Sequence, residues 1–166
     1  MTKKTTTEAV HWNLNDVFPD GKFDTLYAEI EAEMPKYAEW QKKLAPDMSE
    51  ADFQAYFAWS FALSEKLTLL YSRPSLAEST DAKSEEAKRD KPRAQDLAVR
   101  LREVSRPISM WLKGTEVAGM QTLDDANAKR LFACIEGMEY ALTYARDMAR
   151  HTLAQAEESI ISHKDA

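Results

Sequence analysis

Apolar residues recur along most of this chain at steps of three and four residues, the spacing that places them on one face of an α-helix. The successive runs start at Phe23, Phe53, Leu97, Leu131 and Thr152. Polar and charged residues fill the positions between them, as on the outer face of a packed helix. The pattern predicts an all-α fold, an antiparallel bundle of long helices.

Prolines within these runs predict that the helices are partly kinked. Pro35 removes one backbone donor, so it is expected to kink the first helix or divide it. Arg73 and Pro74 are expected to stop or bend the second helix, and Pro107 is expected to bend the third. Gly137 can split the fourth run into two helices.

Capping residues predict several helix ends. Ser49 followed by Asp52 resembles a capping box, with Asp in place of the usual Glu. The pair Lys113-Gly114 is typical of a helix C-terminus, since it combines a cation with a glycine. Asp124 or Asp125 can cap the helix that follows.

Two stretches depart from the helical period. Residues 1–10 are interpreted as a disordered polar tail, and the segment after them carries Trp12, Leu14 and Phe18, which can dock onto a helical surface. Residues 75–95 are polar, which predicts a solvent-exposed helical arm or a partly mobile connection. Residues 11–166 are therefore expected to form one helical domain.

Composition and charge narrow the classes of partner. The chain has 166 residues, of which 44% are hydrophobic and only four are glycine, which favours a helical core over a sheet. A net charge of −6 does not favour nucleic-acid binding, and the basic residues between 83 and 102 alternate with acidic ones, as on a solvated helix face. The N-terminus lacks an apolar secretion signal, and no apolar run of about 18 residues could span a membrane. The predicted location is cytoplasmic.

The sequence contains no recognisable catalytic motif. The single cysteine, Cys134, excludes an internal disulfide and is expected to pack in the core. No glycine-rich phosphate loop and no strand-turn-helix nucleophile elbow occurs. An aromatic set could line a peptide groove, but its helical spacing indicates core packing first; the set is Trp40, Tyr56, Phe57, Trp59 and Tyr71.

None of the histidines belongs to a His-Glu-x-x-His helix, which would supply two zinc ligands and a general base. The three histidines are His11, His151 and His163. Instead of Glu, they are followed by Trp12, Thr152 and Lys164. Glu8 with His11 and Asp147 with His151 have ligand-like spacing, but a polar tail and an ordinary helix end explain them better. We assign no catalytic residue, no cofactor-binding residue and no metal ligand.

The segment 12–18, WNLNDVF, resembles the W-x-L-x-D-[LV]-[FY] opening of oligoendopeptidase F-type proteins, thimet-like zinc metallopeptidases that hydrolyse short peptides. The helical run from Phe23 and the segments 67–71, 108–112 and 140–161 follow in the order that this family shows. Two features depart from the family pattern: Ala154 stands where a helix-capping Ser is usual, and Lys91-Pro92 interrupts an expected continuous helix.

The resemblance implies that the zinc ligands and the catalytic glutamate belong to a C-terminal catalytic domain absent from this chain. No cap follows the last run, so the chain is expected to be truncated before that domain. By resemblance, these helices would form a lid-like N-terminal domain that shapes or covers the substrate channel. The expected partners are the missing catalytic domain, short peptides and, through an exposed apolar face, a second copy. The alternatives are a free-standing helical module that binds a peptide or protein, and a metal-binding bundle enzyme.

Overall fold

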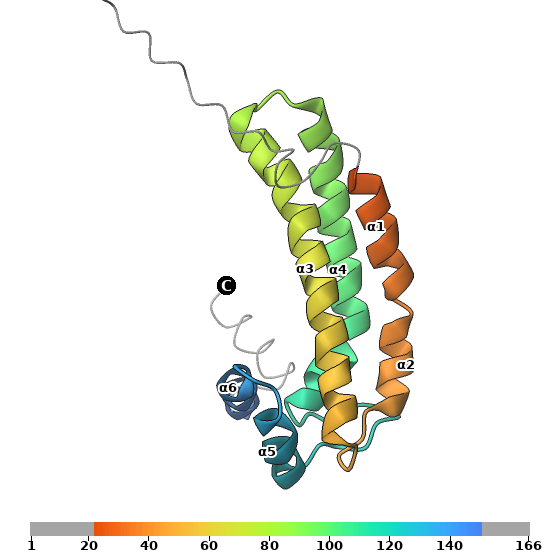
Figure 1. The fold of residues 1–166 in the computed structure, drawn as a ribbon, viewed down its shortest axis with the longest axis vertical. Helices are drawn as coiled ribbons and strands as arrows, with labels where there is room; N and C mark the ends of the chain where they lie inside the picture. The colour runs from red at the N-terminus through yellow and green to blue at the C-terminus, as the bar shows by residue number, and fades with distance from the viewer. Residues whose placement is uncertain (1–21, 151–166) are drawn as a thin grey trace, which may run out of the picture. The chain divides into compact units, whose positions relative to one another are not determined.

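The computed structural model describes residues 22–150 of the chain. Among these residues it contains only helices and the loops that connect them (Figure 1). The helices are α1 (Lys22–Glu33), α2 (Lys36–Lys43), α3 (Glu50–Thr80), α4 (Glu85–Leu112), α5 (Asp125–Ala133) and α6 (Glu139–Ala149). The predicted all-α helical bundle is confirmed.

The described chain divides into two compact units. Unit 1 consists of residues 22–32 and Ser64–Val99, and unit 2 of Glu33–Leu63 and residues 100–150. Helices α3 and α4 each contribute residues to both units.

In unit 1, α3 and α4 form a hairpin joined at residues 81–84, and α1 lies beside it (Figure 1). The Asp90 carboxylate is only 2% exposed and accepts hydrogen bonds from Arg89 and Arg93. Arg93 also pairs with Asp24 of α1 at 2.8 Å. Because a buried carboxylate is costly without partners, this network fixes α1 against α4. The buried apolar side chains are Phe23, Ile30, Leu70, Ala87, Ala94 and Leu97.

The polar stretch 75–95 is helical apart from its turn, which agrees with the first of the two predicted alternatives. It contains the end of α3, the turn and the start of α4. Ala87, Asp90 and Ala94 point into the core every third or fourth residue, so small side chains and one paired acid replace the usual large apolar stripe. The predicted solvent-exposed helical arm is therefore confirmed for most of this stretch, and only these three core-facing positions depart from it.

From the sequence, Arg73-Pro74 is expected to stop or bend the second helix; the pair does not stop it, because α3 continues to Thr80. Proline removes one backbone hydrogen bond, and this cost is offset here because Leu70 and Pro74 are fully buried. Helix α4 likewise passes through Pro92 and Pro107 without ending. Lys91-Pro92 therefore does not interrupt the helix.

In unit 2, the N-terminal half of α3 packs against α2 and α5 through aromatic rings. Tyr37 meets Trp59 edge-on at 4.8 Å, and Phe53 stacks with Phe132 at 6.4 Å. Trp59 also donates a 2.6 Å hydrogen bond to Glu33. Tyr56 lies within the same cluster, where burial raises the pKa of its phenol.

Most of the predicted helix ends are confirmed. Pro35 separates α1 from α2, and the Asp52 amide donates to the Ser49 hydroxyl at 3.1 Å. Gly114 ends α4 with a φ of +76°, and Gly137, at +75°, separates α5 from α6. In the Schellman pattern, the amides of residues 114 and 115 donate to the carbonyls of residues 111 and 110. Of the two candidate caps, it is Asp124 that accepts from the Asn127 amide.

Candidate functional site

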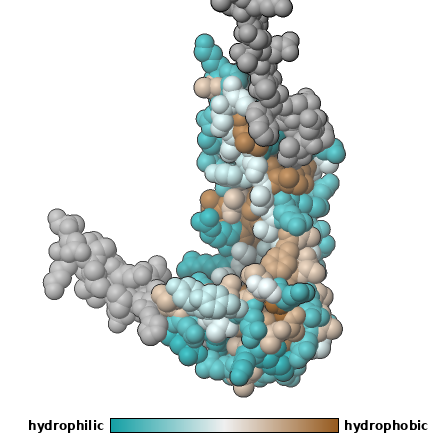
Figure 2. Space-filling model, turned by 60° about the vertical axis from the view of Figure 1, so that its left-hand side comes forward, coloured by the Kyte–Doolittle hydropathy of each residue, from teal (hydrophilic) through white to brown (hydrophobic). Residues whose placement is uncertain are grey.

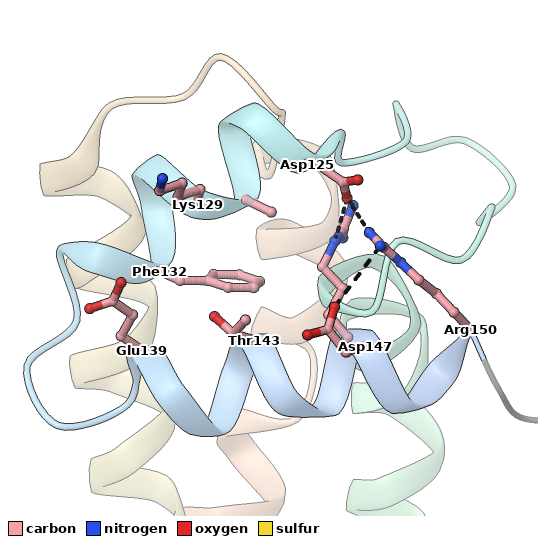
Figure 3. Close-up of a pocket in the computed structure, with 9 residues that line it drawn as sticks. Asp125, Lys129, Phe132, Glu139, Thr143, Asp147 and Arg150 are labelled. Atoms are coloured by element: carbon pink, nitrogen blue, oxygen red, sulfur yellow. Dashed lines mark hydrogen bonds and ion pairs between the residues drawn. The ribbon is translucent and has the colours of Figure 1, made fainter.

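Helices α5 and α6 line an open pocket of about 320 Å³ within unit 2 (Figure 3). The two helices are joined by residues 134–138, where the positive φ of Gly137 turns the chain. The pocket is lined by Asp125, Ala128, Lys129, Phe132, Glu139, Thr143, Arg146, Asp147 and Arg150.

The buried guanidinium of Arg146 connects the elements around the pocket. Arg146 is 7% exposed, and its Nη1 donates to the Leu112 carbonyl at 3.1 Å, at the end of α4. Its Nη2 donates to the Leu123 carbonyl at 2.6 Å and to the Asp125 carboxylate at 2.9 Å, at the start of α5. One side chain of α6 therefore satisfies backbone and side-chain acceptors from α4, α5 and the loop between them.

The loop after α4 comes unusually close to this guanidinium. A β-carbon added at Gly114 would lie 2.7 Å from Nη1 of Arg146. The four hydrogen bonds of Arg146 prevent its guanidinium from moving aside. Two separate features therefore require glycine at position 114: the positive φ and the close approach of the Arg146 guanidinium.

The Asp125 carboxylate is shared by two arginine side chains. Its Oδ1 accepts from Nε of Arg146 at 3.1 Å and from Nη2 of Arg150 at 2.5 Å. The hydrogen bond from Arg146 and then that from Arg150 hold the pKa of the Asp125 carboxyl below its ordinary value of 3.8. Asp147 lies 4.0 Å from Arg150, so the charges at this end of the pocket neutralise one another.

The apolar wall of the pocket is rigid. Phe132 is 1% exposed, and its ring is held from behind by Phe53. Ala128, one turn earlier on α5, is buried beside it. Phe132 and Ala128 therefore form the closed base of the pocket, and the surface that a ligand could touch belongs mainly to the exposed lining side chains around them.

Three polar side chains of the pocket have no hydrogen bond or ion pair with any residue between 22 and 150: Lys129, Glu139 and Thr143. Figure 3 shows Lys129 on α5 and Glu139 on α6 on one side of Phe132, while Asp125 and Arg150 lie on the other. The pocket thus has a neutralised end and an end with one ammonium and one carboxylate that remain available.

The residues that the sequence singled out for metal chemistry fall mostly outside the described part. His11, His151, His163 and Glu8 are all in residues 1–21 or 151–166. Within residues 22–150, no three residues of the His, Cys, Asp or Glu types are placed to hold a metal ion. Asp147 lines the pocket and pairs with Arg150.

The other candidates behave largely as core residues. Tyr56 and Phe57 are buried, and Trp40 and Trp59 are half-buried, which agrees with core packing rather than a peptide groove. Tyr71 is 40% exposed, so the prediction of core packing is wrong for this residue. Cys134, the C-cap residue of α5, is only half-buried, and this burial raises the pKa of its thiol. For Cys134 the prediction of core packing is therefore only partly correct.

The pocket itself was not predicted from the sequence. The one available signal is Arg146, an arginine in the apolar face that Leu142, Ala145 and Ala149 define. Such a position indicates a buried, fully bonded guanidinium, but its partners lie 21 or more residues away in the sequence. None of the described helices has the length and hydropathy that crossing a membrane requires.

Comparison with protein-family models, with curated proteins and with solved structures finds no match to this chain.

Replacing Arg146 with Lys is expected to reduce the free energy of unfolding by about 2–3 kcal/mol, because Lys cannot reach all the acceptors and leaves buried carbonyls unpaired. Arg150→Lys is the matched control, since Arg150 bonds the same carboxylate but is half exposed; its cost should stay below about 1 kcal/mol. Urea unfolding measures both. Equal costs would show that Arg146 has no special structural role.

Gly114→Ala and Gly119→Ala separate the close approach at Gly114 from backbone strain. Both residues have positive φ, +76° and +78°, but only Gly114 has atoms in the way of a β-carbon. Gly119→Ala is expected to destabilise the fold by about 1 kcal/mol, and Gly114→Ala by at least about 1 kcal/mol more. Thermal or urea unfolding would contradict this account if the two variants lost the same stability.

Asp125 should make stability depend on pH in acid. Because its folded pKa is lowered, the carboxylate stabilises the fold above pH 3.8, and this contribution is lost as the pH falls through the lowered value. Asp125→Asn should therefore be less stable than the original chain at pH 7, and the difference should shrink below pH 3.8. Urea titrations across this range test it, with exposed Asp47→Asn as the control. A difference that stays constant with pH would exclude this ion pair as its source.

Proposed function

We propose that this chain is the N-terminal helical domain of an oligoendopeptidase F-like zinc metalloendopeptidase that cleaves short peptides. The sequence contains no His-Glu-x-x-His motif, so in this proposal it shapes or covers the substrate channel rather than catalysing hydrolysis. Zinc and the catalytic residues would belong to a catalytic domain of the same cytoplasmic parent protein. The ordered family-like segments and the all-α fold support this proposal.

The observation that carries the proposal is an exposed aromatic face on α6. Tyr140 is 81% exposed and Tyr144 is 54% exposed, and their rings stack at 6.0 Å. Met148, 47% exposed, continues the same line one turn further along. Residues at this spacing share one helix face, and large aligned apolar groups at a surface favour contact with another protein surface. A catalytic domain packed on α6 would cover this face.

Exposed hydrophobic residues elsewhere provide weaker support. Phe61, Leu69 and Leu76 of α3 are partly exposed. In the view of Figure 2, hydrophobic residues appear as separate spots between hydrophilic ones. Isolated apolar residues at a surface are common and need no partner. The α6 face is therefore the stronger indication of a contact surface.

The second candidate function is a free-standing helical module that binds a peptide or a protein. The α5–α6 pocket favours this alternative, since its lining includes Lys129 and Glu139, which have no partners within residues 22–150. Stable monomers with saturable peptide binding would distinguish this module from a domain that needs its catalytic partner.

Measuring the self-association of the purified chain tests whether the exposed α6 face binds another protein surface. Sedimentation equilibrium should show reversible association that the Tyr140→Ser, Tyr144→Ser double variant weakens at least about tenfold, because it removes two large exposed side chains that the association would bury. Tyr71→Ser, at a single partly exposed tyrosine of α3, is the control and should leave association unchanged. A monomer at all concentrations would favour the free-standing module.

The parent protein is tested by reading the coding DNA beyond codon 166. The proposal expects an open frame that continues to an in-frame His-Glu-x-x-His motif. The purified chain should not hydrolyse a fluorescence-quenched peptide with added zinc. A stop codon directly after Ala166, or hydrolysis that a chelator abolishes, would overturn the proposal.

A further inference from the structure

We propose that the α5–α6 pocket binds a small zwitterion: an amino acid or short peptide with a free ammonium group and a free carboxylate. This inference goes beyond the peptidase role and does not depend on it. It rests on which charges of the pocket are already paired, which remain available, and the size of the space between the two helices.

The charges of the lining balance. Its cationic residues are Lys129, Arg146 and Arg150, and its acidic residues are Asp125, Glu139 and Asp147. A pocket with no net charge favours a ligand with no net charge, because a lone anion would meet Glu139 and a lone cation would meet Lys129. This argues against inorganic phosphate or a polyamine as the occupant.

The two charges that remain available come from different helices. Asp125 is occupied by Arg146 and Arg150, whereas Lys129 and Glu139 form no ion pair with each other or with any other residue between 22 and 150. Figure 3 shows both on the same side of Phe132. The Lys129 ammonium can donate to a ligand carboxylate while the Glu139 carboxylate accepts from a ligand ammonium.

The remaining walls suit the body of such a ligand. Phe132 and Ala128 are buried at the base of the pocket and fix its floor, while the exposed Thr143 hydroxyl can donate to or accept from a peptide group. The volume of about 320 Å³ lies near the lower end of small-molecule sites. It therefore favours an amino acid or dipeptide over a longer chain.

The ligand class can be tested by isothermal titration calorimetry of the full chain with L-leucine and with leucyl-leucine. At least one of them should bind saturably, and comparison of the two distinguishes a free amino acid from a peptide. N-acetylation should weaken the binding of that ligand at least about tenfold, and so should amidation of its carboxylate, because each removes one charge. No saturable binding by either, or equal binding of the blocked forms, would overturn the proposal.

Variants identify the residues responsible. Lys129→Met and Glu139→Gln should each weaken binding about tenfold, and Lys129→Glu should weaken it further. The double variant Lys129→Glu, Glu139→Lys restores one charge of each sign and should recover part of the affinity, which a structural defect would not do. Lys42→Met and Glu103→Gln are controls outside the pocket lining and should bind normally, with circular dichroism confirming that all variants fold. Equal losses in the controls, or no recovery in the double variant, would contradict the site.

Discussion

The structure around the pocket depends on one constraint: a buried guanidinium must have a partner for nearly every N–H group it carries. Arg146 meets this requirement only if the end of α4, the residue before the α5 cap and the first residue of α5 all come to the same place. Gly114 is part of the same constraint, because any side chain there would occupy the position of the guanidinium. The pocket beside α6 is thus a consequence of how one polar side chain is buried.

This constraint also determines which charges are available for function. Arg146 and Arg150 share Asp125, so the end of the pocket next to the α4–α5 loop is a closed set of ion pairs. Lys129 and Glu139 lie outside that set and form no pair within the described residues. Structural stability and ligand recognition can therefore be assigned to different residues of the same small site. The exposed tyrosines of α6 have a third role in our proposals, as a surface for a larger partner.

Unit 1 also contains a buried charge, which is paired by side chains of the same helix. Its core includes Asp90, whose charge is balanced by Arg89 and Arg93, and Arg93 connects to Asp24 on α1. The guanidinium of Arg93 also lies 5.0 Å from the centre of the Phe23 ring, so it contributes an aromatic contact as well as an ion pair. A polar network thus provides contacts that large apolar side chains would otherwise provide, which explains how the charge-rich segment before Leu97 is held in a helix hairpin.

The sequence alone was sufficient to predict the helical fold class, the break at Pro35, the cap at Ser49 and the glycine-ended helices at Gly114 and Gly137. These features follow from φ preferences and hydrogen bonds between residues a few positions apart, so they can be read locally. Only the tertiary structure decided that α3 continues through Pro74, that Asp90 and Arg146 are buried, and that Lys129 and Glu139 line one pocket. Each of those outcomes depends on which distant groups are nearby, and Arg146 finds its carbonyl partners 34 and 23 residues away. A single sequence does not specify such pairings, because the cost of burying a polar group is set by partners that only the complete fold brings together.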